Sequence, residues 1–555
     1  MNNQRIHQSR VSCITGIFFF LFITILGYLF HIQIQQHQFF IEKGKRQYYL
    51  TVTQYPPRGT FFDRKNRPLT INQETVSLFI NPKLLAYREQ LTPFLQKQFP
   101  DAYKRLTEKP TTPFLFIKRH ISKEELAIAQ EQDLKDLHML PEHKRWYLEP
   151  SLGNTLGITN IDNTGITGLE FVYNQDLAGT PSIYALQKDA RSKAYYFTKE
   201  PLEEGSCGKD IPLTIDKDLQ ACAYQCLKDH VQKWKAIEGM VLIMNPADGG
   251  IYASAMYPDS NPNNPQSEHD ITHLKNRCFT ECYELGSVMK TFTALAALES
   301  KTIQPEDQIN CFNTKETTIN GIRVTTWKAG GTLSFTDVIR QSNNIGTSQV
   351  ALKMGKKLHT YLRSYGFGQK TGIAYPGEAT GSITPPKNWS NATPLSLSFG
   401  YEISVSALQL ASAFCMIANN GISTTPRLIQ EEPIHTKHIA DETAVKTLRE
   451  IITINKSTSP YHAARIDGYT IQGKTGSAHL LTNGHYDEMR NIYTFAGIVE
   501  QGTYQRVLVI IIKEPKKEAG KNLYAATVAA PLFKKIAEEM LVIEKIPPNY
   551  TAVQS

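Results

Sequence analysis

The chain has 555 residues, too many for one ordinary domain, and its length predicts roughly two to four domains. Apolar residues make up 41% and charged residues 20%, near the averages of globular proteins, so the composition excludes a mainly disordered chain. The net charge of +8 is spread along the chain and not gathered into basic arms, which disfavours nucleic acid as a partner.

An uncharged apolar run lies near the N-terminus, where residues 13–30 read CITGIFFFLFITILGYLF. This run is just long enough to cross a hydrocarbon core of about 30 Å as a helix. A buried core helix and a cleaved signal are the alternatives, but no A-x-A cleavage site follows. Arg5 and Arg10 precede the run, so the positive-inside rule predicts a cytoplasmic tail at 1–12 and an extracytoplasmic C-terminal portion. We expect a single-pass protein of the inner membrane.

Residues 31–205 alternate short β-type runs with charged helical stretches such as 122–137, and no catalytic spacing stands out there. The composition turns small and polar at 205–210, which indicates a domain boundary. We predict an α+β pedestal domain at 31–205, a larger second domain at 206–546, and a short tail at 547–555.

The second domain begins with a helical pattern at 218–237, followed by a hairpin at 239–257 with its turn at Pro246 to Gly250. Near its other end, three strand patterns and a helical pattern follow in the order 469–480, 491–500, 506–514 and 523–541. The residues between these two ends look mostly helical. Strands from both ends around a helical middle predict a mixed α/β sandwich, with helices on the faces of a mostly antiparallel sheet.

The eight cysteines include two C-x3-C pairs, Cys222 with Cys226 and Cys278 with Cys282. Neither pair has zinc spacing or a matching histidine pair, so we expect no metal site. The composition offers no cofactor motif, and we expect buried free thiols instead of a disulfide framework.

A candidate nucleophile and base lie three residues apart in YELGSVMKTFTALAALE, which contains Ser287 and Lys290. At the head of an apolar helix, this spacing places hydroxyl and amine on one face. Burial lowers the pKa of a lysine, so a desolvated Lys290 could accept the serine proton. S-x-x-K alone is weak evidence, because about two such patterns are expected by chance in a chain of this length.

Two further motifs follow in order: Ser342 and Asn344 in QSNN, and Lys474, Thr475 and Gly476 in IQGKTGS. A second hydroxyl can relay a proton, and an amide can hold a lysine. A second lysine can attract a substrate carboxylate and discourage protonation of the first. A glycine on the strand leaves room for a substrate. Separately each motif could be a helix start, a helix cap or a strand end, but together they indicate serine acyl transfer.

One competing motif needs attention, because residues 468–475 also match the phosphate-loop pattern G-x-x-x-x-G-K-T. A phosphate loop requires a helix that begins at its lysine. Residues 469–472 alternate as a strand and Gly476 follows, so we interpret the segment as a strand and reject nucleotide binding.

With these motifs in place, the chain resembles the class B penicillin-binding proteins, which are monofunctional peptidoglycan D,D-transpeptidases. PPRGTFFDRKNRPL at 56–69 is similar to the family's pedestal motif, with Asn66 where glycine is usual. Residues 398–422 resemble the division-specific, septal FtsI type, although Glu402 replaces a glycine. Leu285 replaces the proline that is usual at its position in the family. Ser477 replaces the last threonine of the usual K-T-G-T motif.

The resemblance implies that Ser287 is the acylated nucleophile and that Lys290 is its base. It implies that Thr475 holds the terminal carboxylate of a D-Ala-D-Ala donor, and that the backbone N–H groups of Ser287 and Ser477 form the oxyanion hole. The remaining catalytic residues would be Ser342, Asn344 and Lys474, with Gly476 lining the substrate.

The implied partners are peptidoglycan stem peptides, with a D-Ala-D-Ala donor and an amine acceptor, and β-lactam antibiotics. The family also implies a membrane glycosyltransferase and division proteins. Two alternatives stay open: a hydrolase with the same motifs, either a D,D-carboxypeptidase or a β-lactamase, and a non-enzymatic β-lactam sensor or divisome scaffold. The acceptor amine and the oligomeric state do not follow from the sequence.

Overall fold

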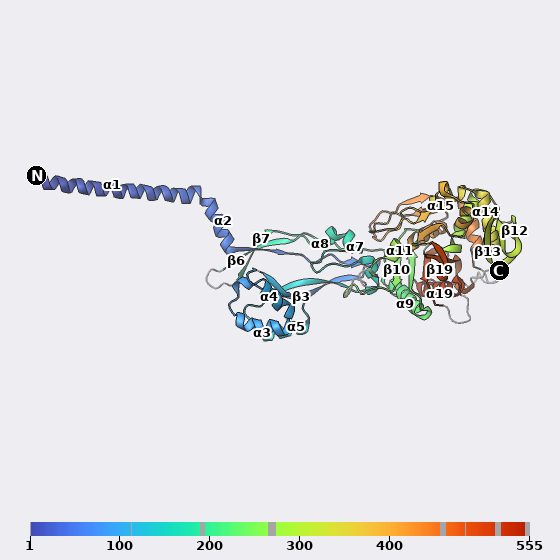
Figure 1. Ribbon diagram of the computed structural model, residues 1–555, viewed down its shortest axis with the longest axis horizontal. Coiled ribbons are helices and arrows are strands. Elements are labelled where there is room, and N and C mark those ends of the chain that lie inside the picture. The colour runs from blue at the N-terminus through green and yellow to red at the C-terminus, as the bar shows by residue number, and fades with distance from the viewer. Residues whose placement is uncertain are drawn as a thin grey trace. The chain divides into compact units, whose positions relative to one another are not determined.

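The structure is a computed structural model that describes residues 2–112, 114–188, 195–264, 273–454, 462–482, 484–516 and 523–549. It begins with the long helix α1 (Asn2–Phe30), a π-helical turn η1 (His31–Gln35) and α2 (His37–Tyr48) (Figure 1). Residues Arg10–Gln35 are long and apolar enough to cross a membrane, and they include the predicted span 13–30. This helix fits a single-pass anchor. Most of the predicted tail 547–555 lies outside the described residues.

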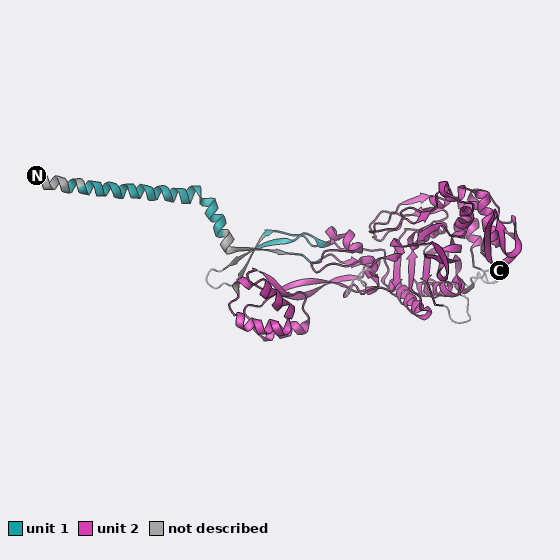
Figure 2. Cartoon of the chain, viewed as in Figure 1, with its two compact units in different colours: residues 1–57, 178–208 teal, residues 58–177, 209–555 magenta. Residues whose placement is uncertain are grey.

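The chain divides into two compact units (Figure 2). The first comprises Met1–Pro57 and Ala178–Gly208, and the second comprises Arg58–Leu177 and Lys209–Ser555. Besides its helices, the first unit has an antiparallel sheet of β1 (Tyr49–Gln54), β6 (Ser182–Lys188) and β7 (Tyr195–Glu203), with β6 in the middle. The limits that we predicted for the pedestal differ from these units, and they stay a prediction.

The N-terminal part of the second unit has its own three-stranded sheet and core. The strand β3 (Thr70–Ile80) lies between β4 (Leu115–Lys118) and β5 (His138–Tyr147), antiparallel to both. Leu78 and Ile80 of β3 and Ile117 of β4 share one core with side chains of α3 (Arg88–Gln98) and α4 (Pro100–Glu108). The helix predicted within 122–137 is α5 (Lys123–Glu131), capped by Ser122. The other short elements here are β2 (Phe61–Phe62), η2 (Pro82–Leu84), η3 (Pro150–Leu152), α6 (Gly153–Leu156), α7 (Gly168–Val172) and α8 (Asn174–Ala178).

Arg58 of the pedestal-type motif belongs to a buried set of charges. Glu170 accepts hydrogen bonds from Arg58 at 2.6 Å and from Arg145 at 2.7 Å, and all three residues are less than 5% exposed. Removing one member would leave buried charge without its partner, so the three side chains fix this region as a set. Asn66 has φ 58°, which confirms that asparagine occupies a left-handed position.

The C-terminal part is built on one five-stranded sheet in the order β10-β9-β20-β19-β18, antiparallel throughout. Its strands are β9 (Glu238–Met244), β10 (Ile251–Tyr257), β18 (Thr470–Thr482), β19 (His485–Gln501) and β20 (Tyr504–Lys513). The helices α9 (Lys217–Trp234) and α19 (Ala525–Ile543) contact one set of buried side chains of the sheet, and α17 (Ala407–Ala418) belongs to a second core. The predicted α/β sandwich is confirmed.

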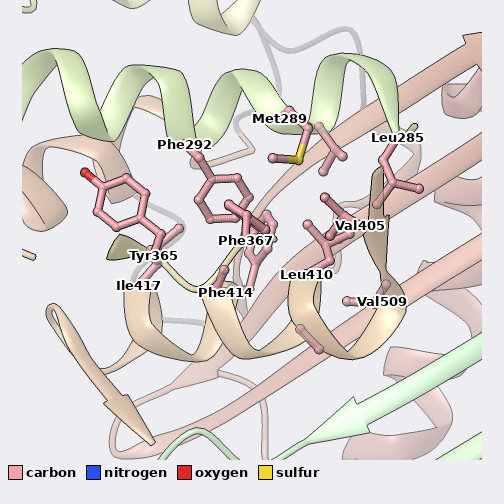
Figure 3. Packing of buried hydrophobic residues seen from close by; sticks show 14 of the residues in the cluster. Leu285, Met289, Phe292, Tyr365, Phe367, Val405, Leu410, Phe414, Ile417 and Val509 are labelled. Atoms are coloured by element: carbon pink, nitrogen blue, oxygen red, sulfur yellow. The ribbon is translucent and has the colours of Figure 1, made fainter. Parts of the chain in front are cut away.

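The second core surrounds the helix that begins at Lys290. In Figure 3, Met289 and Phe292 from this helix region point toward Phe414 and Leu410 of α17. The ring of Phe292 packs edge-on against Phe414 with centroids 5.6 Å apart. The other helices of this middle region are α11 (Arg277–Thr280), η4 (Gly286–Met289), α12 (Lys290–Glu299), α13 (Phe335–Arg340), α14 (Asn344–Met354), α15 (Lys357–Ser364), η5 (Pro386–Asn388), α16 (Thr393–Ser398), α18 (Glu442–Ile451) and η6 (His462–Ala464).

The middle region also contains strands that the sequence analysis missed. A long hairpin joins β12 (Gln308–Ile319) to β13 (Ile322–Ser334), through Asn320 and Gly321, both at positive φ. An Asn-Gly turn is a typical hairpin signal, so the sequence did contain evidence for it. The remaining short strands are β8 (Ile211–Pro212), β11 (Cys282–Tyr283), β14 (Ser382–Ile383), β15 (Ile403–Ser406), β16 (Ile422–Thr424) and β17 (Thr436–His438).

Candidate active site

Ser287 lies in the 3₁₀ turn η4, which leads directly into α12. Gly286 before it has φ 59°, and a Cβ there would lie 2.2 Å from the carbonyl oxygen of Ser477. Only glycine fits this conformation and this approach, so the G-S pair in the sequence has a backbone reason. Ser287 is partly exposed while Gly286 and Val288 are buried. The turn therefore presents one hydroxyl from an otherwise buried segment.

Lys290, the first residue of α12, is fully buried, and its amine contacts both catalytic hydroxyls. Nζ lies 3.0 Å from Ser287 Oγ and 3.1 Å from Ser342 Oγ, and it donates to the Ser342 carbonyl at 2.7 Å. It also donates to Asn344 Oδ1 at 2.5 Å. Burial first, and then the nearby Lys474 charge, hold the pKa of Lys290 well below its usual range. A neutral amine can donate to those two carbonyl oxygens and keep its lone pair for the Ser287 proton.

Ser342 and Asn344 flank the start of α14, where Asn343 forms the N-cap by accepting from Gly346 N. Ser342 has φ 55°, a left-handed conformation that is unusual for serine and that turns its hydroxyl toward both lysines. The strand β13 orients the amide of Asn344, because Asn344 Nδ2 donates to the Thr325 carbonyl at 2.7 Å. Its Oδ1 therefore faces Lys290.

Lys474 lies on β18 and is 1% exposed. Its Nζ lies 2.9 Å from Ser342 Oγ, so this hydroxyl stands between two amines. Burial lowers the pKa of Lys474 to about 7. The ammonium form of Lys474 is therefore less favoured near neutral pH than that of an exposed lysine, unless an anion lies beside it.

Thr475, Gly476 and Ser477 continue β18, which is the edge strand of the sheet. Gly476 also has a packing reason: a Cβ there would lie 2.1 Å from the Leu285 carbonyl oxygen, so it makes room for the turn η4. The Ser477 hydroxyl lies 3.4 Å from Ala525 N, at the start of α19. Because β18 is an edge strand, its alternate N–H groups point away from β19.

The strand β18 also bears on the phosphate-loop pattern at residues 468–475. β18 runs unbroken from Thr470 to Thr482 and pairs with β19 through Lys474, so no helix begins at this lysine. Without helix N–H groups at that point, the segment cannot hold a phosphate as a phosphate loop does. The interpretation of this segment as a strand is confirmed from Thr470 onward.

The structure thus brings the three separated motifs into one site. Sequence reasoning missed its supporting residues, above all the carbonyl of Thr325 and the hydroxyl of Thr326, which lies 3.4 Å from Asn344 N. No pattern in the sequence links β13 to the Ser342 loop, because both contacts depend on tertiary packing. The arrangement can supply a nucleophile, a base with a lowered pKa and a proton relay, which are the groups that acyl transfer through serine requires.

Comparison with known proteins agrees with this chemistry. A family model described as "Penicillin binding protein transpeptidase domain" matches residues 239–538, and one described as "Penicillin-binding Protein dimerisation domain" matches residues 53–213. The probable peptidoglycan D,D-transpeptidase PbpC of Pseudomonas aeruginosa is 28% identical, over 99% of this chain and 97% of that protein. The peptidoglycan D,D-transpeptidase FtsI of Buchnera aphidicola subsp. Schizaphis graminum is 29% identical, over 97% and 95%.

Solved structures show the same fold. Penicillin-binding protein 3 of Mycobacterium tuberculosis, complexed with aztreonam, has a TM-score of 0.68 at 22% identity, covering 90% of this chain and 98% of that chain. A peptidoglycan glycosyltransferase from Burkholderia ambifaria has a TM-score of 0.53 at 27% identity, covering 61% and 99%. The likeness extends beyond the C-terminal part of the chain.

Proposed function

The chain belongs to the penicillin-binding protein transpeptidase family, and from this membership we propose its function. It is a serine-type peptidoglycan D,D-transpeptidase, an acyltransferase that cross-links stem peptides in cell-wall synthesis and binds β-lactams. One observation supports the assignment of the reacting groups: hydrogen bonds connect two hydroxyls and two amines in series, Ser287, Lys290, Ser342 and Lys474.

In the first half-reaction, Ser287 Oγ attacks the carbonyl carbon of the penultimate D-Ala of the donor. The hydroxyl proton passes to the neutral amine of Lys290 as the C–O bond forms. The backbone N–H groups of Ser287 and Ser477 stabilise the oxyanion, an effect worth about 3 kcal/mol per donor in comparable sites. The C–N bond then breaks, and the leaving D-Ala takes a proton through the Ser342 hydroxyl.

In the second half-reaction, the amine of a neighbouring stem peptide attacks the ester on Ser287. Lys290, neutral again, takes a proton from the attacking amine, and the Ser287 oxygen leaves with a proton as the new amide forms. The result is a cross-link and free enzyme. A hydrolase would instead need water to reach the ester as readily as the amine does.

Lys474 and Thr475 bind the donor carboxylate in this scheme. An anion beside Lys474 would raise its pKa from about 7 and keep the ammonium charged while the donor is bound. The charge would then help to keep Lys290 neutral, because Lys474 is one of the two causes of its lowered pKa. Donor binding would thus prepare the base for attack.

The location and the partners are part of the proposal. The apolar helix Arg10–Gln35 anchors the chain in the inner membrane, with the catalytic part outside the cytoplasm, where stem peptides are found. Relatives named FtsI support a role at division, together with a membrane glycosyltransferase and division proteins.

Covalent labelling tests the function. The full chain in detergent is incubated with a penicillin, and the adduct is mapped by mass spectrometry and followed over time. We expect one stable adduct on Ser287 and none in Ser287→Ala, whose thermal unfolding should be unchanged because only a partly exposed hydroxyl is lost. A stoichiometric adduct on another serine would refute the assignment, and an adduct that hydrolyses within seconds would indicate a β-lactamase.

A further inference from the structure

A carboxylate outside the catalytic set lies three residues before the nucleophile. Glu284 Oε1 accepts the backbone N–H of Glu402 at 2.7 Å and the hydroxyl of Tyr486 at 3.2 Å. Its other oxygen, Oε2, is buried and has no hydrogen-bond partner within the described part of the chain. Burial raises the pKa of Glu284, as expected for a carboxyl group withdrawn from water. Glu284 therefore connects the segment before Ser287 to a loop more than 100 residues later.

That loop, residues 399–402, packs its backbone directly against the backbone of η4, the turn that carries Ser287 and is called the nucleophile turn below. Gly400 has φ 91°, and a Cβ there would lie 2.2 Å from the Gly286 carbonyl oxygen. Glu402 has φ 57°, a left-handed conformation that a glutamate does not favour. Something outside the loop must hold Glu402 in this conformation, and the Glu284 carboxylate binds the N–H of that residue.

The nucleophile turn is also in contact with β18 on its other side. Gly286 lies against the Ser477 carbonyl, and Gly476 lies against the Leu285 carbonyl, both closer than any Cβ would allow. Residues 399–402, the turn and β18 are therefore stacked without side chains between them. The separation of the Ser287 and Ser477 N–H groups depends on this stack.

Two tyrosines, Tyr401 and Tyr486, also connect the loop, the β18–β19 hairpin and Glu284. Tyr401 accepts the N–H of His479 on β18 at 3.2 Å, and its ring packs edge-on against Tyr486, with centroids 4.9 Å apart. Tyr486 in turn donates to Glu284. Glu284 is thus the one acceptor in this set that contacts both the loop and the β18–β19 hairpin.

We propose that Glu284 is a positioning residue for the oxyanion hole, which holds the loop 399–402 against Gly286 and so fixes the spacing of the Ser287 and Ser477 N–H groups. The proposal deepens the transpeptidase assignment and rests on it. The role of Glu284 requires an acceptor oxygen at hydrogen-bond distance from the Glu402 N–H. It does not require a negative charge. It should therefore affect the acylation step more than ligand binding.

Four variants of the full chain separate reach from charge. Glu284→Gln keeps the length and an acceptor oxygen, Glu284→Asp keeps the charge but is one methylene shorter, and Glu284→Ala removes both. The fourth combines Glu284→Ala with Glu402→Gly, because glycine adopts a left-handed conformation without strain. Stopped-flow acylation by a chromogenic β-lactam gives the non-covalent Kd and the acylation rate constant separately, and thermal unfolding reports the fold.

We expect Glu284→Ala and Glu284→Asp to lower the acylation rate constant by about 30-fold, with Kd changed less than about twofold, since a displaced donor costs less than the 10²-fold or more of a removed one. Glu284→Gln should stay within about fivefold of the parent protein, and Glu402→Gly should restore most of the loss in Glu284→Ala.

Equal acylation by the parent and Glu284→Ala would overturn the proposal, and so would activity retained in Glu284→Asp but lost in Glu284→Gln. Weaker non-covalent binding, seen as a higher Kd with an unchanged acylation rate constant, would also overturn it. If Glu284→Ala does not fold, the comparison of Glu284→Gln with Glu284→Asp decides alone. Failure of the parent protein to acylate at Ser287 would refute the transpeptidase assignment itself, whatever the variants do.

Discussion

Two buried lysines, Lys290 and Lys474, share the hydroxyl of Ser342 but have different roles in the mechanism. Lys290→Arg keeps a positive charge and removes the base, because a guanidinium does not lose its proton in proteins. Acylation should fall by about 10³-fold or more, close to the loss in Ser287→Ala. Lys474→Arg keeps the charge near the ligand carboxylate, so acylation should fall only about tenfold. Second-order acylation rates with a chromogenic β-lactam measure both. Equal rates in the two variants would remove Lys290 from the role of base.

The lowered pKa of this one residue, Lys474, predicts that the rate of acylation depends on pH. Because burial lowers this pKa to about 7, the ammonium is present below this pH and is lost as the pH rises through it. The second-order rate of acylation reports the free enzyme, so for a β-lactam with a carboxylate it should decline above about pH 7. Lys474→Arg stays charged and should lack this decline. An identical alkaline limb in the variant would assign the titration to another group.

At the scale of elements, β18 and the turn η4 approach each other closely at two glycines, Gly286 and Gly476. Gly476→Ala would place a Cβ 2.1 Å from the Leu285 carbonyl oxygen, so strand and turn must separate. We expect acylation to fall by about 100-fold or more, because Ser287 and the oxyanion donors lie on the two elements that move apart. Gly331→Ala on β13 is the matched control, since nothing lies within 4 Å of its added Cβ. Acylation rates and thermal unfolding of both variants test this, and an active Gly476→Ala would mean that the contact is not needed.

For the whole molecule, the sign of the flanking charges predicts which side of the membrane the enzyme occupies. Arg5 and Arg10 precede the uncharged run 13–30, so the tail should stay in the cytoplasm. A reporter that is active only outside the cytoplasm should be active when fused to the C-terminal end. A reporter of the opposite kind serves as the control at the same point. Activity of the cytoplasmic reporter would contradict both the orientation and the role in wall synthesis.

Most of the fold followed from local patterns. Alternating apolar residues indicated the strands that became β9, β10, β18, β19 and β20, and helical spacing indicated α9 and α19. The β12–β13 hairpin was missed, although its Asn320–Gly321 turn is a recognisable signal. Its strands are mostly polar, and buried residues alternate with exposed ones only over short stretches such as Gln308–Cys311. This alternation is too short to be read as a strand from the sequence.

The sequence by itself determined the candidate reacting residues, because a serine, two lysines and an amide, set in three short motifs, restrict the possible chemistry. It also determined the long apolar helix, since the length and hydropathy of one helix are local properties. Only the tertiary structure decided the lowered pKa of Lys290 and of Lys474, which depends on burial by distant segments. It alone gave Gly476 its reason and brought Thr325 to Asn344 and Glu284 to Glu402. Contacts between backbone atoms far apart in the chain leave no periodicity or spacing in the sequence, because any residue can supply a carbonyl or an N–H.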